Sequence, residues 1–295
     1  MSDSMASLQH KMNSAGELES VVRTMKAMAA SNISQYERAV RALETYYHTV
    51  QLGLTICFRQ RDVFEVEPIK PAKEESAGVI VLGSDQGLVG QFNDELADFM
   101  AQSLHDLSGE KIVCAVGERM QMCLRDRGFA LASVLVVPNS ISAMTTLVGQ
   151  ILLTLKTWQD GNPRMPVYIF HNHPQSGALY EPVRLRLLPL DAVWQQNLLA
   201  LPWPTGNVPE VMGGVMPTLQ ALIREYLFVS LFRACAESSA SENASRLAAM
   251  QRAGKNIDEL QTKFKHTFYR LRQNGIDEEL FDVIAGFEAL SPAGS

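Results

Sequence analysis

Residues 237–271 have the sequence ESSASENASRLAAMQRAGKNIDELQTKFKHTFYRL, and this stretch decides the fold. An apolar stripe recurs there at steps of four, three and four residues, formed by Leu260, Phe264, Thr267 and Leu271. The first part, 237–251, is mostly Ala and Ser, which lets another backbone come close. The helical pattern extends from about Met216 to Leu290 and would span on the order of 100 Å. We therefore predict a long helix that runs against a partner or projects as a rod.

The N-terminal segment carries a matching apolar seam, and proline is absent before Pro68. Most of its members follow alternating steps of three and four: Leu8, Met12, Ala15, Leu18, Val22, Met25, Ala29, Tyr36, Val40, Leu43, Tyr47, Val50 and Leu54. One slot, near Asn32 and Ile33, is ambiguous. Such a heptad pattern predicts a left-handed supercoil. The alternative, two amphipathic helices that cap an ordinary core, does not need a seam of this length. We predict that the two terminal helices form a long antiparallel coiled coil.

In the middle of the chain the spacing of the apolar residues changes. Short apolar runs typical of buried strands, at 78–83, 111–116, 131–137 and 166–170, alternate with helical stripes. An alternating run at 183–187 suits an edge strand. This order predicts an α/β domain with an open, mostly parallel, Rossmann-like sheet. The predicted parts are an N-terminal helix at 1–60, a linker at 61–76, the sheet domain at 77–200, a loop at 201–215 and a C-terminal helix at 216–295.

Composition excludes several classes of protein. The chain has 295 residues, of which 46% are hydrophobic and 20% charged, so the composition is neither disordered nor membrane-like. Its N-terminus is too polar for a signal peptide, and no apolar run is long enough to span a bilayer. The net charge of -6 gives no sign of nucleic-acid binding. The four cysteines are scattered, which is typical of reduced thiols in a cytoplasmic protein.

A glycine-rich turn follows the first predicted strand. Residues 83–90, GSDQGLVG, occupy the place where doubly wound folds bind phosphates. The spacing matches neither G-x-G-x-x-G nor a P-loop, so we favour a tight turn over a nucleotide site.

The other candidate sites are weak. His171 and His173 flank Asn172 at the end of a strand, but no third metal ligand is evident nearby, so we interpret them as a loop pair. No nucleophile elbow marks a catalytic triad. We predict no catalytic residue, no metal and no cofactor.

Basic residues gather on both terminal helices of this acidic protein. They are Arg23, Lys26, Arg38 and Arg41 on one helix, and Arg246, Arg252, Lys255, Lys263, Lys265, Arg270 and Arg272 on the other. A solvated helix face is the simplest interpretation. The alternative is a rod that meets an acidic surface.

Three motifs resemble the gamma subunit of F-type ATP synthases. Residues 21–33, VVRTMKAMAASNI, are similar to the family's ITKAMKMVAASKL, and 84–93, SDQGLVGQFN, to its SDRGLCGGFN. Residues 237–253, with RQNGI at 272–276 and the stretch 286–290, resemble its ES-ASE-AARM-AM and RQ-xx-IT endings. The motifs cover nearly the whole chain in the family's order.

The chain also departs from the family pattern. The usual NTQKIT approach is replaced around residues 17–20, and other changes are Thr24 for alanine, Asn32 for lysine, Leu247 for methionine and Asp277 for threonine. These departures favour a divergent branch. An alternative, sodium-linked enzyme is one form of it, and the sequence leaves proton and sodium coupling open.

The resemblance implies a central rotary stalk, itself without catalysis, that transmits torque for ATP synthesis or hydrolysis. The implied partners are the ring of three alpha and three beta subunits, the epsilon subunit and the membrane c-subunit ring. One copy per complex would lie peripherally on the cytoplasmic face of a bacterial inner membrane. The implied rotor–stator contacts are Met25, Lys26, Glu242, Arg246, Arg272 and Gln273, and the implied apolar shaft tip is Leu280, Ile284, Phe287 and Leu290.

Two other classes of function are alternatives. A nucleotide-binding α/β enzyme with dimerising helices would rest on Gly87 and Gly90 alone. A coiled-coil adaptor would explain the terminal helices but not the spaced motifs.

Overall fold

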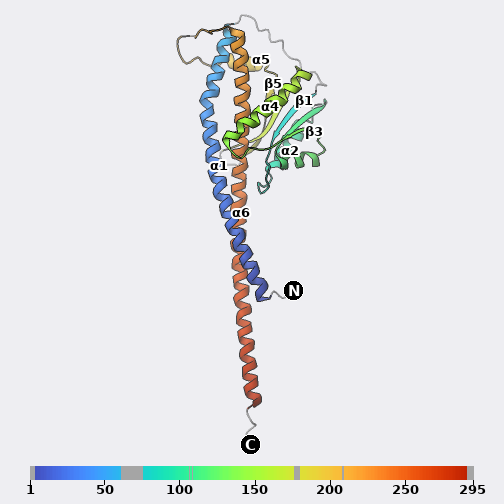
Figure 1. The fold of residues 1–295 in the computed structure, drawn as a ribbon, viewed down its shortest axis with the longest axis vertical. Coiled ribbons are helices and arrows are strands. Elements are labelled where there is room, and N and C mark those ends of the chain that lie inside the picture. Colours follow the sequence, from blue (N-terminus) through green and yellow to red (C-terminus); the bar gives the residue numbers. More distant parts are fainter. Residues whose placement is uncertain are drawn as a thin grey trace. The chain divides into compact units, whose positions relative to one another are not determined.

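A computed structural model describes residues 4–60, 76–105, 107, 109–175, 180–207 and 209–290, with side chains to residue 286 (Figure 1). The chain divides into two compact units, which are described separately. Unit 1 comprises Met1–Met28 and Leu247–Ser295, and unit 2 comprises Ala29–Arg246.

The elements follow in the order α1 (Met5–Arg59), β1 (Ala77–Leu82), α2 (Phe92–Ser103), β2 (Lys111–Val116), α3 (Glu118–Asp126), β3 (Leu131–Leu135), α4 (Ile141–Gly161), β4 (Val167–His173), β5 (Glu181–Leu188), α5 (Ala192–Leu199) and α6 (Val215–Leu290). The predicted long terminal helices and the alternation of strands and helices are confirmed. The predicted linker at 61–76 falls almost wholly outside the described residues.

The two terminal helices, α1 and α6, have 55 and 76 residues. Gly213 and Gly214 precede α6 with φ values of 84° and 98°, a left-handed conformation that glycine adopts without strain. Pro217 lies in the first turn of α6, where its missing N–H costs no helical hydrogen bond. The chain therefore reverses at the glycines, and α6 then continues without interruption.

The predicted seam of α1 is mostly confirmed. Buried positions recur at heptad spacing, at Leu8, Ala15, Ala29, Tyr36 and Val50. Leu18 was wrongly placed in the seam, because 57% of its surface is exposed. The neighbouring Glu19 faces the partner helix instead.

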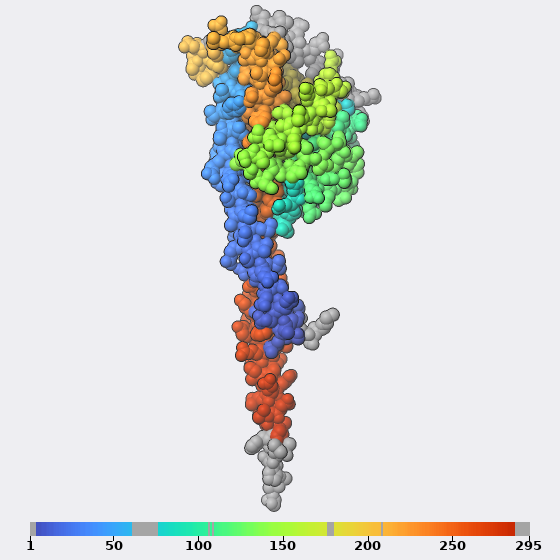
Figure 2. Space-filling view, in the orientation of Figure 1, coloured from blue at the N-terminus to red at the C-terminus, as the bar shows by residue number. Residues whose placement is uncertain are grey.

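In unit 1, α1 and α6 run antiparallel. Gln261 Nε2 donates to Glu19 Oε2 at 3.1 Å, and the Val22 side chain lies over Gly254, 3.8 Å from where a Cβ would stand. Beyond these contacts the α6 side chains from Ile276 to Ile284 are exposed. Figure 2 shows the red end of α6 uncovered on the visible face.

In unit 2, a sheet of five strands has the order β3-β2-β1-β4-β5. The first four strands are parallel, and β5 pairs antiparallel with β4 at one edge. This confirms the predicted open, mostly parallel sheet and its edge strand. Side chains of β1 alternate between two cores: Val79 and Val81 pack with α2 and α3, whereas Ile80 and Leu82 pack with α4 and α6.

A third apolar cluster joins both terminal helices to α5, a helix that has no counterpart among the predicted elements. It contains Val50, Leu54 and Cys57 of α1, Leu198 of α5 and Leu219 of α6. Asp191 caps α5, because its Oδ1 accepts from the backbone N–H of Trp194 at 2.9 Å. Near this cluster Tyr47 and Tyr226 stack at 5.6 Å, so α1 and α6 are also paired in unit 2.

Candidate functional site

The family-like motifs of unit 2 meet where α6 crosses the carboxyl ends of the strands. Three serine hydroxyls of α6 donate to backbone carbonyls there: Ser238 to Leu82 and Ser241 to Asn172, both at 3.0 Å, and Ser245 to Val89. All three serines are buried. Serine is small enough for close approach and supplies a donor to carbonyls at the ends of β1 and β4 and in the turn that follows β1. The Ala- and Ser-rich sequence of 237–251 thus docks α6 on the sheet.

This docking fills the place where doubly wound folds bind ligands. Such ligands lie outside the carboxyl ends of the strands. Here that edge retains a cavity of about 10 Å³ beside Gly83 and Ser238. Small-molecule sites need roughly 300 Å³ or more. The geometry favours the tight-turn interpretation of residues 83–90 over the nucleotide site.

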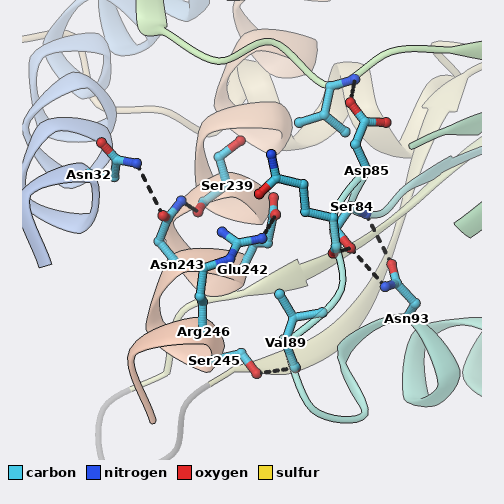
Figure 3. A network of polar contacts seen from close by, with 12 residues as sticks. Asn32, Ser84, Asp85, Val89, Asn93, Ser239, Glu242, Asn243, Ser245 and Arg246 are labelled. Atoms are coloured by element: carbon cyan, nitrogen blue, oxygen red, sulfur yellow. Dashed lines mark hydrogen bonds and ion pairs between the residues drawn. The ribbon is translucent and has the colours of Figure 1, made fainter. Parts of the chain in front are cut away.

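The turn itself is held by a closed polar network (Figure 3). Ser84 N–H donates to Asn93 Oδ1 at 3.0 Å, and Asn93 Nδ2 donates to Ser84 Oγ at 2.8 Å. Ser84 Oγ donates in turn to the carbonyl of Gln86 at 3.0 Å. Gly90 has a φ of 62°. The first and last residues of the motif 84–93 therefore fix each other, and the motif acts as a structural turn.

Asp85 ties this turn to two further loops. Its Oδ1 accepts from the N–H of Glu118 at the start of α3, and its Oδ2 from the N–H of Val137, both at 2.9 Å. The carboxylate also meets the positive end of the α3 dipole. At Gly117, whose φ is 106°, a Cβ would lie 2.6 Å from the carbonyl oxygen of Ser84, so only glycine fits.

Two predicted contact residues of α6, Glu242 and Arg246, bind each other. Arg246 Nη2 lies 2.5 Å from Glu242 Oε1, and the side chains are only 12% and 9% exposed. Burial raises the pKa of Glu242, an effect that the charge of Arg246 opposes. Beside this pair, Asn32 Nδ2 donates to Asn243 Oδ1 at 3.3 Å, which links α1 to α6 through one of the residues that depart from the family pattern.

The remaining predicted contact residues lie in unit 1. Met25 is half-buried and Lys26 is exposed, and Lys26 lines a groove of about 560 Å³ together with Arg23, Gly254 and Lys255. Arg272 and Gln273 are exposed. Of the predicted tip, Leu280 and Ile284 are 55% and 45% exposed. The side chains of Phe287 and Leu290 lie outside the described residues.

The interpretation of His171 and His173 as a loop pair is wrong. Both belong to β4, and Glu237 of α6 lies between them. Glu237 Oε2 is 2.9 Å from His171 Nε2 and 3.0 Å from His173 Nδ1. Glu237 is 66 residues from His171 in sequence, and only the docking of α6 brings them together.

The fold and the junction define an α/β protein with paired terminal helices, whose ligand-binding edge is filled by its own helix. A family model described as ATP synthase matches residues 4–290, so the chain belongs to the ATP synthase family. The resemblance inferred from the three motifs is thereby confirmed.

Curated relatives are similar over nearly their full length. An ATP synthase gamma chain of Leifsonia xyli subsp. xyli is 26% identical over 294 residues, which covers 97% of each chain. One of Arthrobacter sp. is 25% identical and covers 96% of this chain and 97% of the relative.

Solved structures share the fold. A chain of the Euglena gracilis mitochondrial ATP synthase rotor has a TM-score of 0.62 and 15% identity, with 92% of this chain and 98% of that chain covered. A chain of the Tetrahymena thermophila mitochondrial ATP synthase central stalk and c-ring has a TM-score of 0.58 and 22% identity, with 79% and 99% covered. Within the described residues, we find no helix with the length and apolar character needed to cross a membrane.

Proposed function

We propose that this chain is the gamma subunit of an F-type ATP synthase and turns as the central stalk between a membrane ring and a catalytic ring. The main support for this proposal is the family match over residues 4–290. Curated gamma chains that match over nearly their full length and central-stalk structures of the same fold support the assignment. In this role the protein transmits torque and is not itself catalytic.

The docking of α6 suits a part that transmits torque. A shaft must not slip against its base, and three buried serines of α6 donate to carbonyls of the sheet and of the turn that follows β1. Breaking any of these contacts would leave a buried polar group unpaired, which costs about 1–3 kcal/mol. Torque applied to α6 would therefore reach the sheet of unit 2 without local sliding.

The exposed part of unit 1 suits contact with a surrounding ring. We propose that Met25, Lys26, Arg272 and Gln273 meet the beta subunits, with Glu242 and Arg246 supporting the facing helix. These polar contacts must break and re-form during each turn, so few of them should be strong. The exposed apolar residues Leu280 and Ile284, with Phe287 and Leu290, would turn inside an apolar collar.

The remaining assignments follow from the same proposal. The partners are three alpha and three beta subunits, the epsilon subunit and the c-subunit ring, with one copy of this chain per complex. The complex lies on the cytoplasmic face of a bacterial inner membrane, where this chain is peripheral. The departures at Thr24, Asn32 and Asp277 fit a divergent branch, and both proton and sodium coupling are compatible with them.

The test is co-expression with the alpha and beta subunits from the same genome, followed by sizing and an ATPase assay. We expect a complex of three alpha, three beta and one copy of this chain, with ATPase activity that depends on it. A chain that elutes alone or as a dimer beside an assembled ring would refute the stalk. A matched control is the ring co-expressed with the chain truncated after residue 246, which keeps unit 2 but lacks the α6 part of unit 1.

A further inference from the structure

The cluster of His171, His173 and Glu237 lies outside the surfaces used by the proposed function. Its three potential ligand atoms lie within 4.8 Å of one another. Two come from neighbouring same-face positions of β4, and the third comes from α6. The acid and His171 are almost fully buried, whereas 38% of the His173 side chain is exposed.

We propose that His171, His173 and Glu237 form a binding site for a divalent transition-metal cation, with Zn²⁺ as the best match. Two imidazoles and one carboxylate with a free fourth position form a known zinc ligand set. At zinc–ligand distances of about 2.0–2.1 Å, ligand atoms of a tetrahedral site lie roughly 3.3 Å apart. The observed separations of 2.9 and 3.0 Å from Glu237 Oε2 need to grow by only a few tenths of an ångström.

Binding requires that the two ring nitrogens that face Glu237 carry no proton. Without metal, His171 Nε2 and His173 Nδ1 both face the oxygen Oε2 of Glu237 and donate to it. When these two nitrogens give their lone pairs to the cation, each neutral ring carries its proton on the opposite nitrogen. Glu237 Oε2 exchanges two hydrogen bonds for one metal bond.

The surroundings orient the carboxylate and leave access to the site. Arg233 Nε donates to the other oxygen, Oε1 of Glu237, at 2.7 Å, so Oε2 is the atom available to a metal. An adjoining cavity of about 340 Å³ is lined by His171, His173 and Glu237 and provides the approach and the fourth coordination position.

Two features lower the expected affinity. Nδ1 of His171, which would carry the proton in the metal-bound state, is buried without a hydrogen-bond partner among the described residues. Metal-bound histidines are usually supported by such a partner, and its loss typically weakens binding about 10- to 100-fold. Arg233 and Arg184, which both line the cavity, also place positive charge near the cation. We therefore expect an exchangeable site, weaker than a structural zinc site.

The test uses the metal-free full-length chain titrated with Co²⁺ and then Zn²⁺. We expect visible absorption bands of tetrahedral Co²⁺ that Zn²⁺ removes, with one cation bound per chain. The variant His173→Asn keeps a donor for Glu237 but loses a ligand, and should weaken binding by more than about 100-fold. The matched control is His48→Asn, which removes an exposed histidine of α1 and should leave binding unchanged.

A second measurement keeps the test decisive if His173→Asn does not fold. In the wild-type chain, Zn²⁺ should shift the ¹⁵N resonances of both His171 and His173 rings in the direction of the tautomer change. The proposal is overturned if these resonances do not respond, or if His173→Asn binds as tightly as the wild type. Thiolate–cobalt charge-transfer bands would also overturn it, because they would place the metal at a cysteine.

Discussion

Two stretches of the same helix, α6, behave in opposite ways. From Glu237 to Ser245, nearly every side chain is buried, although most are polar or charged. From Arg272 to Gly286, nearly every side chain is exposed, including several large apolar ones. Hydrophobicity alone would have predicted that the first stretch is exposed and that the second is buried. Burial of the first depends on small side chains whose polar atoms find partners, and exposure of the second is expected of a surface that meets another protein.

The largest effect should come from enlarging a buried serine of α6. Ser241→Leu places a bulky side chain against β4 and removes the donor for the carbonyl of Asn172. We expect a loss of about 3 kcal/mol or more in the free energy of unfolding, from overpacking and an unpaired carbonyl. Chemical denaturation measures it. The matched change Gln273→Leu, at an exposed position, should stay within about 0.5 kcal/mol. Equal losses in the free energy of unfolding of both variants would contradict the proposed difference in packing between the two stretches.

Asp85→Ala tests the turn against which Ser245 of α6 docks. The substitution leaves the N–H groups of Glu118 and Val137 without their acceptor. Because both are backbone donors, one at the first residue of α3 and one in the loop before α4, we expect about 2–3 kcal/mol of destabilisation. Asp282→Ala, on the exposed stretch of α6, is the control and should be nearly neutral. A neutral result for Asp85→Ala would mean that solvent replaces the carboxylate at little cost.

A smaller and sharper comparison is Ala→Gly within α6. Both Ala240→Gly and Ala285→Gly carry the intrinsic helix cost of about 1 kcal/mol. Ala240 is 3% exposed and also loses a buried methyl group, worth about 0.8 kcal/mol, whereas Ala285 is exposed. We therefore expect Ala240→Gly to cost nearly twice as much in thermal or chemical unfolding. A larger cost at Ala285 would show that its stretch is packed in the isolated chain.

The smallest effect on stability, but not on function, is expected for Arg272→Ala combined with Gln273→Ala. Both side chains are exposed, so the free energy of unfolding of the isolated chain should change by less than about 0.5 kcal/mol. In the assembled enzyme the same double variant should lower torque during ATP-driven rotation. Unchanged rotation and torque would remove these two residues from the proposed mechanism.

The parts of the fold that the sequence predicts are those with a local period. The heptads of α1, the buried strands and the length of α6 can each be recognised within a window of consecutive residues. Helix α5 was missed because its eight residues are too few for a clear period. The predictions at Leu18 and at His171 failed because each depends on which residue of a distant segment lies opposite.

The candidate site shows the same limit. The motifs around Ser84 and Glu237 can be recognised in the sequence. The local sequence does not predict, however, that Ser238, Ser241 and Ser245 donate to carbonyls of the sheet and of the turn after β1. Those pairs lie 156, 69 and 156 residues apart in sequence. The partner of the two histidines gives only a weak signal in the sequence. The segment 237–251 is rich in Ala and Ser, which indicates close packing, and Glu237 is one of the two acidic residues in it.

The docking of α6 also orders events in time as the chain is made. Synthesis proceeds from the N-terminus, so α1 and all five strands leave the ribosome before residues 237–245 exist. Until then the carbonyls of Leu82 and Asn172 lack the serine donors of α6, and the part of α1 that pairs with this stretch of α6, such as Asn32, is uncovered. The last quarter of the polypeptide therefore completes the fold, and its contacts are non-local, which slows folding. A nascent chain of this kind has to be kept from aggregating until α6 emerges, and we expect chaperone demand to peak just before that point.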